Sequence, residues 1–518
     1  MSSNKSIAKS AGIIGSATLL SRVLGFVRDI MFAAFFGTGM YAQAFVVAFR
    51  IPNLLRDLVG EGATNAAVVP VLVEELMHKG EKQFWKLANI LLNILLLILT
   101  ALTVMGVLFS RPMVVAIAPG FLADPAKLNV TVALTQAIFP YLFLIGLAAY
   151  SMGVLNSLKH FTAPAFGPSM LNISLIICML IWRADIIGLA VGVLLGGLLQ
   201  VLMQIPPLLK KGAVFDQKQF MHPQVKKLGR LLLPRVFGTG VYQINVFIST
   251  ILASIGGIVG EGAVAALYFS NRIMQLPLAI FAIALAQAAL PTLSGHIATN
   301  QMDKFRNAIN FLLRGVSFVL LPASAGLIAL SSPITETLLQ RGAFDKYSTA
   351  ITSSALLYYA FGLLAYGAIK ILVNGFYSMQ DTKTPVKVAA FSVGVNIILN
   401  LIFMFPLKVG GLALATSISG ILNAVILFVI LKRRVVTLHE AKLFRSLVKI
   451  IIASALMGLF ALWFYNYLSS VFTSSASLSS IINLLVSIAG SIIVYIAASY
   501  LLQIEELKEI KRWVLRKR

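Results

Sequence analysis

Residues 8–36 read AKSAGIIGSATLLSRVLGFVRDIMFAAFF, an apolar stretch that is long enough to cross a lipid bilayer. Arg22 and Arg28 lie inside this stretch, and Asp29 follows the second arginine directly. A charged side chain within a membrane is costly, so it usually marks a functional site. We therefore interpret the stretch as a membrane-spanning helix that carries part of a binding site.

The composition of the whole chain indicates an all-α polytopic membrane protein. The 518 residues are 59% hydrophobic and 12% charged, whereas soluble domains are about 45–50% apolar and about 25% charged. The apolar runs are long and lack strand alternation, which favours helices over a barrel. About 14 transmembrane helices are expected, at residues 8–36, 42–72, 87–109, 131–157, 164–182, 187–209, 229–257, 262–294, 308–331, 348–376, 386–406, 410–431, 446–468 and 480–503.

The net charge of +24 is distributed by topology. Alternate connections, starting with the N-terminus, hold 28 lysines and arginines, and the remaining connections hold six. The positive-inside rule then predicts that both termini lie in the cytoplasm. The basic residues are explained by this orientation and by contact with anionic membrane lipids, so no nucleic-acid partner is expected.

Self-comparison reveals an internal repeat at an offset of about 221 residues. The correspondence covers six spans, an even number, so both copies have the same orientation and form a parallel pseudo-twofold repeat. We expect two six-helix lobes, 1–215 and 216–435, and a C-terminal helix pair with a basic tail, 436–518. A duplication without mechanistic meaning is the alternative. The matched positions are Phe49 to Ile51 with Asn271 to Ile273, Pro70 with Pro291, Phe84 and Asn89 with Phe305 and Asn310, Pro112 with Pro333, Gly153 with Gly375, and Pro164 with Pro385.

The first two spans each carry a polar face. An arginine fork binds phosphate or carboxylate oxygens in bidentate fashion and stays charged at any relevant pH, so this face suits an anionic ligand such as a diphosphate. Gly25 allows close approach of a backbone or ligand. Pairing with Asp29, Asp57 and Glu61, or snorkelling to the membrane interface, is the alternative role for these arginines. The candidate residues are Ser21, Arg22, Gly25, Arg28 and Asp29 in the first span, and Arg50, Asn53, Arg56 and Glu61 in the second.

Arg272 extends the cationic set into the second lobe, where no acid lies near it in sequence. Lys370 also lies in an apolar span, as a cavity residue or a structural partner. Arg235 and Arg314 are expected to snorkel to the membrane interface. One cysteine, Cys178, and dispersed histidines give no support for a metal centre, and no phosphate-binding glycine loop is present. No cofactor is expected, while coupling to a monovalent cation or to the membrane potential stays open.

Four motifs carry a resemblance to a known family. They are SRVLGFVRD at 21–29, FRIPNLLR at 49–56 followed by Glu61-Gly62-Ala63, APGF at 118–121, and GFYSMQDTKTPVK at 375–387. With them, the chain resembles the MurJ (MviN) lipid II flippase family of the multidrug/oligosaccharidyl-lipid/polysaccharide exporter superfamily. The resemblance runs essentially from end to end.

The resemblance implies fourteen helices around a cationic cavity and alternating access that moves lipid II between the leaflets of the bacterial inner membrane. Position by position, Arg22, Arg28, Arg50, Arg56, Glu61 and Arg272 match cavity residues, and Asp29 matches the first-helix acid. The last helix pair matches a groove for the undecaprenyl tail, and cell-wall synthesis machinery stays open as a partner. Gln43 and Asn271 stand where many relatives carry an acid, so no mechanism that needs those acids is carried over.

Other functions remain as alternatives. A flippase for another undecaprenyl-diphosphate-linked oligosaccharide would use the same arginines. A cation-coupled drug exporter of the superfamily would favour acidic and aromatic cavity residues. A membrane enzyme would need converging carboxylates or a histidine with a nucleophile, and the acids here are embedded among arginines. A non-transporting scaffold would tolerate loss of those arginines.

Overall fold

The computed structural model describes residues 2–56, 68–183, 185–213, 224–225, 228, 243–435, 437–438, 440–472 and 477–509. The chain divides into two compact units. Unit 1 comprises Met1–Ile255 with Arg341–Ala343, and unit 2 comprises Gly256–Gln340 with Phe344–Arg518. This division reflects packing, whereas the lobe boundaries at residues 215 and 435 reflect sequence correspondence and stay a prediction.

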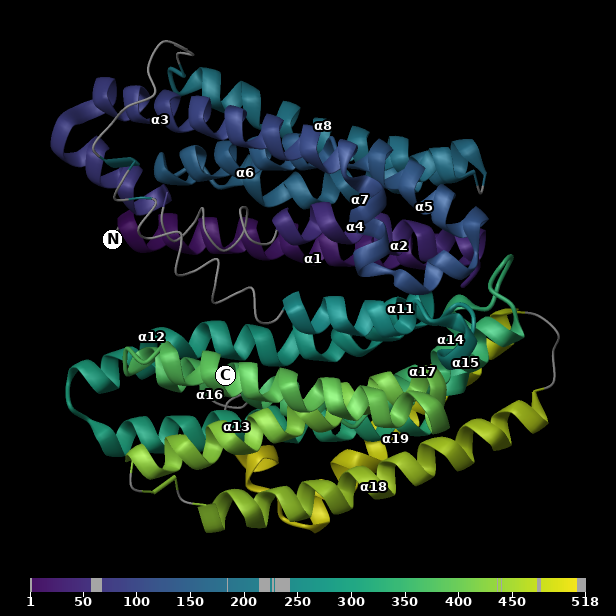
Figure 1. The fold of residues 1–518 in the computed structure, drawn as a ribbon. Helices are drawn as coiled ribbons and strands as arrows, with labels where there is room; N and C mark the ends of the chain where they lie inside the picture. Colours follow the sequence, from purple (N-terminus) through teal and green to yellow (C-terminus); the bar gives the residue numbers. More distant parts are fainter. Residues whose placement is uncertain are drawn as a thin grey trace. The chain divides into compact units, whose positions relative to one another are not determined.

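Unit 1 is a bundle in which α1 packs on α7, α7 on α8, α6 on α8, α3 on α6 and α2 on α5 (Figure 1). Its apolar centre between α3, α6 and α8 includes Phe84, Leu87, Val154 and Leu208. The helices are α1 Ser2–Phe36, α2 Met40–Arg56, α3 Val69–Leu108, α4 Ser110–Ile117, the 3₁₀ turn η2 Pro119–Ala123, α5 Pro125–Ile138, α6 Tyr141–Ser157, α7 Thr162–Trp182, α8 Ile186–Lys210 and the helix Gln243–Ala253.

Unit 2 is a second bundle, in which α13 packs on α16 and α18, and α17 packs on α15 and α16 (Figure 1). Its α18 also packs on α19, and Phe318, Ile450, Met457 and Tyr495 join α13 to this last helix pair. The elements are α10 Gly256–Val259, α11 Ala263–Pro277, the π-helical stretch η3 Leu278–Ile283, α12 Ala284–Ala298, α13 Met302–Ala329, α14 Ser331–Leu339, α15 Lys346–Ala360, α16 Leu363–Ser378, α17 Lys383–Val435, α18 Glu440–Val471 and α19 Ser477–Leu501.

The described helices confirm the all-α, polytopic membrane class. Within the described ranges, nine helical spans are long and apolar enough to cross a membrane, or ten if the bent pair α15–α16 is counted as one. The two helices of that pair meet at 45°. The number of fourteen stays a prediction, since several expected spans run through residues outside these ranges.

The sequence repeat reappears in the helix boundaries and caps of the two units. Ser110, Pro125 and Thr162 begin α4, α5 and α7, and Ser331, Lys346 and Lys383 begin α14, α15 and α17, each 221 residues later. Asp124 accepts a hydrogen bond from the Lys127 N–H at 3.1 Å to cap α5, and Asp345 accepts one from the Ser348 N–H at 2.8 Å to cap α15. An aspartate at this position satisfies an N–H group that has no partner within the helix. The duplication thus preserves how corresponding helices begin.

Two long helices contain local breaks that separate predicted segments. Gly80 in α3 has φ of +79°, which glycine adopts without strain, and it divides residues 69–79 from the apolar stretch that follows. Lys408 in α17 has φ of +51°. That break lies between the expected spans 386–406 and 410–431. The element α17 therefore comprises two membrane-length segments.

Candidate functional site

Arg28 of α1 is held by one carboxylate and one amide. Its Nε and Nη2 donate to Asp29 Oδ1 at 3.1 Å and 2.7 Å, and its Nη1 donates to Asn172 Oδ1 of α7 at 3.0 Å. The side chains of Arg28 and Asp29 are 13% and 8% exposed, so water screens this pair weakly. Hydrogen bonds to a charged group are stronger than neutral ones, and these fix two edges of the guanidinium.

Asn172 also contacts the turn of α1 that precedes Arg28. Its Nδ2 donates to the backbone carbonyl of Ser21 at 3.0 Å, so one buried amide joins two positions that are seven residues apart. A Cβ atom at Gly25, between them, would lie 3.6 Å from Asn172 Nδ2, an ordinary van der Waals distance. Three predicted site residues, Ser21, Gly25 and Arg28, therefore meet one side chain of α7.

The helix α8 packs on α7 and fixes its position. A Cβ atom at Gly196 would lie 2.8 Å from the Cα of Leu171, closer than real Cβ contacts, so α8 approaches α7 at the residue next to Asn172 only because glycine stands there. Ser174 donates to the Gly192 carbonyl at 2.8 Å and joins the same two helices. The amide that holds Arg28 thus belongs to a rigid pair of helices.

The remaining predicted residues of unit 1 take different positions. Arg22 is exposed on α1, while Arg50 and Asn53 are half-buried on α2. Arg50 Nη1 donates to the carbonyl of Val246 at 3.3 Å, a contact with the helix Gln243–Ala253. Arg56 ends α2. The side chain of Arg56, and Asp57, Glu61 and Arg235 altogether, lie outside the described residues.

In unit 2, Arg272 is exposed on α11, and its guanidinium lies 5.2 Å from the centre of the Tyr268 ring. This is a cation–π contact, which supports the side chain without neutralising it. The neighbouring Asn271 accepts a hydrogen bond from Gln275. Lys370 is exposed on α16. Gln43 in unit 1, the other position where relatives carry an acid, is buried on α2.

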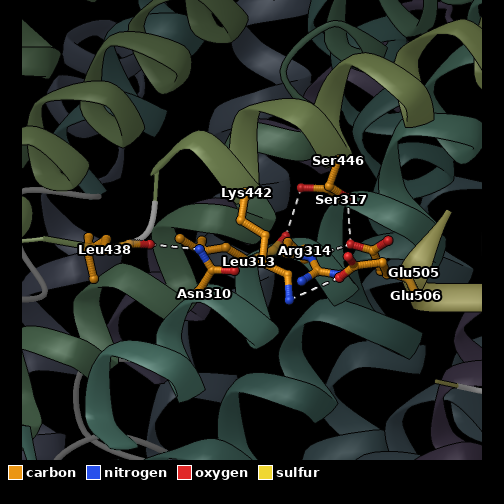
Figure 2. Close-up of polar contacts among 9 residues, drawn as sticks. All are labelled: Asn310, Leu313, Arg314, Ser317, Leu438, Lys442, Ser446, Glu505 and Glu506. Atoms are coloured by element: carbon orange, nitrogen blue, oxygen red, sulfur yellow. Dashed lines mark hydrogen bonds and ion pairs between the residues drawn. The ribbon is translucent and has the colours of Figure 1, made fainter. Parts of the chain in front are cut away.

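The structure corrects the expectation that Arg314 snorkels to the membrane interface. Its guanidinium is 4% exposed and lies on α13 beside two carboxylates from residues that follow α19 (Figure 2). Nε donates to Glu506 at 2.5 Å, and Nη2 pairs with Glu505 at 3.0 Å. This contact could not be predicted from the sequence, because Glu505 and Glu506 are 191 and 192 residues from Arg314 and meet it only in the folded bundle.

The cluster around Arg314 also includes α18. Ser446 Oγ donates to the same Glu506 oxygen at 2.5 Å, and Lys442 Nζ pairs with Glu505 at 3.0 Å (Figure 2). Two cations and two carboxylates give the cluster no net charge. Glu505 lies beyond α19, and the hydrogen bond from Lys442 lowers its pKa against the opposing effect of burial. This neutral arrangement is suited to joining helices and leaves little charge for a ligand.

A third arginine–carboxylate pair lies where α16 is followed by α17. Asp381 Oδ1 caps α17 by accepting from the backbone N–H groups of Lys383 and Thr384, both at 3.0 Å, and Arg434 approaches its Oδ2 at 2.6 Å. Burial acts to raise the pKa of Asp381, but the hydrogen bonds from Thr384 and the charge of Arg434 outweigh it and bring the pKa to about 2. The motif quoted at 375–387 therefore has a structural role at this turn.

Within the described ranges, no group of three or more histidine, cysteine, aspartate and glutamate side chains has the arrangement of a metal site. The cationic side chains of each unit can act on a ligand. In unit 1, Arg28 has an oriented guanidinium and Arg22 is exposed, and in unit 2, Arg272 is exposed. Such groups suit an anion with several oxygen atoms.

Comparisons with known proteins agree on one family. The family described as lipid II flippase MurJ matches residues 32–501. "Probable lipid II flippase MurJ" of Vibrio cholerae is 37% identical and covers 82% of this chain and 83% of its own length. The protein of the same name from Rhizobium meliloti is 35% identical and covers 99% of this chain and 97% of its own length.

Solved structures show the same fold. A structure titled "Lipid II flippase MurJ, inward closed conformation" has a TM-score of 0.77 at 27% identity and covers 94% of this chain and 98% of its own. An inward-facing multidrug resistance MATE family transporter of the MOP superfamily has a TM-score of 0.69 at 15% identity, over 81% of this chain and 96% of its own. The second likeness concerns the fold alone.

Proposed function

The chain belongs to the lipid II flippase MurJ family, and on that premise we propose that it moves lipid II from the inner to the outer leaflet of the bacterial cytoplasmic membrane by alternating access. The protein is then a transporter and not an enzyme. The undecaprenyl-diphosphate headgroup binds the cationic side chains, and no cofactor takes part. Both termini lie in the cytoplasm, and cell-wall synthesis machinery is a further partner.

The observation that carries this proposal is the coordination of Arg28. Asn172, which accepts a hydrogen bond from Arg28, is neutral, and Arg28, Asp29 and the exposed Arg22 together carry a net positive charge on α1. A diphosphate offers several acceptor oxygens and can engage more than one guanidinium. Arg272 and the half-buried Arg50 supply further cations of the same kind.

The membrane potential is the proposed source of energy for resetting the carrier. Moving one elementary charge across 100 mV is worth about 2.3 kcal/mol, which can bias an anion-translocating cycle. A monovalent cation is the alternative coupling agent. If flipping in proteoliposomes is the same with and without an imposed potential, the potential has no such role.

The deciding experiment measures binding of purified protein to lipid II and to undecaprenyl phosphate. Wild type should prefer lipid II, and Arg28→Ala should lose most of that preference, because the diphosphate loses an oriented fork. Arg306→Ala is the matched control, since Arg306 forms an exposed pair with Asp303 at 2.9 Å on α13. Equal binding of lipid II by wild type and Arg28→Ala would contradict the assigned role.

Three further measurements distinguish the alternative functions. Replacing Arg22 or Arg272 with alanine should abolish complementation of a strain depleted of its flippase, whereas a scaffold would still complement. Lipid II recovered after incubation with the protein should be chemically unchanged, whereas an enzyme would leave a covalent modification. A second undecaprenyl-diphosphate oligosaccharide, offered in competition, tests the choice of headgroup.

A further inference from the structure

A buried amide lies where α1 packs on α7. Asn172 is 6% exposed on α7. Burying an amide is costly unless its donor and acceptor both find partners. Both do: Nδ2 donates to the Ser21 carbonyl, and Oδ1 accepts from Arg28.

Asp29 and Asn172 constrain different edges of the Arg28 guanidinium. Asp29 is the next residue on α1 and takes the edge formed by Nε and Nη2. Asn172 belongs to another helix and takes Nη1. A guanidinium held along one edge can still pivot about that edge, whereas a second acceptor from a separate helix fixes its plane. Bidentate recognition of a phosphate depends on that plane.

The choice of an amide instead of a carboxylate has a consequence for charge. A carboxylate at position 172 would orient Arg28 equally well, but together with Asp29 it would neutralise the guanidinium more than once over. The amide provides the same acceptor oxygen with no net charge. Arg28 is thus oriented without the addition of a second negative charge beside Asp29.

We propose that Asn172 is a positioning residue, which fixes the guanidinium plane of Arg28 for a phosphorylated lipid headgroup and does so without neutralising it. The part that concerns the headgroup rests on the function proposed above. The hydrogen bond from Asn172 to the Ser21 carbonyl also fixes the position of α7 along α1. Asn172 acts through Arg28 and needs no contact with the ligand.

The first test needs no ligand. The rate at which phenylglyoxal modifies Arg28 is followed by peptide mass spectrometry in wild type, Asn172→Ala and Ser174→Ala. Ser174 is a matched control, because it is a buried polar residue of the same helix that bonds to α8 instead of α1. We expect Asn172→Ala to speed modification severalfold and Ser174→Ala to leave it unchanged. Equal rates in all three proteins would overturn the positioning role.

The second test is a double-mutant cycle on binding of lipid II. Asn172→Ala should weaken binding about tenfold, the size expected for a hydrogen bond to a charged group, and Asn172→Gln should recover part of the loss. In an Arg28→Met background, Asn172→Ala should have no further effect. A merely structural role would weaken binding equally in both backgrounds, and that result would overturn the proposal.

The two tests also separate this inference from the proposed function. If wild type bound lipid II no better than an anionic phospholipid, the proposed function would fail, and the phenylglyoxal rates would still decide whether Asn172 orients Arg28. If Asn172→Ala raised the reactivity of Arg28 but left lipid II binding intact, the orientation would be real and its role in headgroup binding would be refuted.

Discussion

Two arginines, the half-buried Arg28 in unit 1 and the buried Arg314 in unit 2, are held in contrasting ways. Arg314 meets two carboxylates, Glu505 and Glu506, and Lys442 completes a cluster with no net charge (Figure 2). Arg28 meets one carboxylate and one amide, and the exposed Arg22 adds a further positive charge to α1. The residue type is the same, so its role is set by what surrounds it.

The contrast shows how a membrane protein can use one costly side chain for two purposes. A fully compensated arginine joins helices, because its hydrogen bonds are satisfied within the protein and it attracts no further anion. An arginine oriented by a neutral partner retains a field that draws an anion toward it. Counting arginines in apolar spans cannot separate these cases.

Removing the carboxylate closest to Arg314 should have the largest effect on stability. Glu506→Ala leaves a 4%-exposed guanidinium without its main partner and should cost about 3–5 kcal/mol in the free energy of unfolding. Thermal unfolding in detergent measures it. The double variant Arg314→Met with Glu506→Leu should recover much of the loss, because neither charge is then left buried. If Glu506→Ala unfolded like wild type, the joining role of the cluster would be wrong.

A second carboxylate at position 172, beside Asp29, would give the group around Arg28 a net negative charge. Asn172→Asp is therefore expected to lower the affinity for lipid II about tenfold, roughly 1.4 kcal/mol. Binding assays at low ionic strength measure the change. Gln200→Glu is the control, because it also places a buried acid in unit 1, at a position on α8 whose side chain bonds to the Gly196 carbonyl. An unchanged affinity in Asn172→Asp would show that charge at Arg28 does not matter.

Asp381 and Arg434 provide an intermediate case, in which an arginine–carboxylate pair also caps a helix. Asp381→Asn should destabilise the protein by up to about 1 kcal/mol, because asparagine can still cap α17 but the ion pair with the partly exposed Arg434 is lost. Folding lowers the pKa of Asp381 to about 2, so its contribution is present above the unfolded pKa and is lost as the pH falls toward 2. Wild type should lose more stability over that acid range than Asp381→Asn does. Parallel pH profiles would contradict this.

The exposed member of the Arg314 cluster should matter least. Glu505 is 55% exposed, and its ion pairs with Arg314 and Lys442 are screened by solvent. Glu505→Gln should cost less than about 1 kcal/mol, and added salt should reduce the difference from wild type. Because folding lowers the pKa of Glu505, its contribution is lost as the pH falls through the folded pKa. A loss as large as that of Glu506→Ala would mean that burial does not distinguish the two carboxylates.

The membrane class, the repeat and the arginines of α1 and α11 could be predicted from the amino-acid sequence alone. These properties are local or periodic: apolar runs, an offset of 221 residues, and arginines within spans can all be read along the chain. The caps at Asp124 and Asp345 show why the repeat could be detected in the sequence, since the start of a helix is specified by residues that are neighbours along the chain.

The role of each arginine, in contrast, depends on the tertiary structure. Asn172 stands 144 residues from Arg28, and Glu506 stands 192 residues from Arg314, so no window of sequence contains either pair. Helix packing brings an amide to one arginine and two carboxylates to the other. That packing depends on close approaches such as the one at Gly196, which arise between helices and have no signature within a single helix.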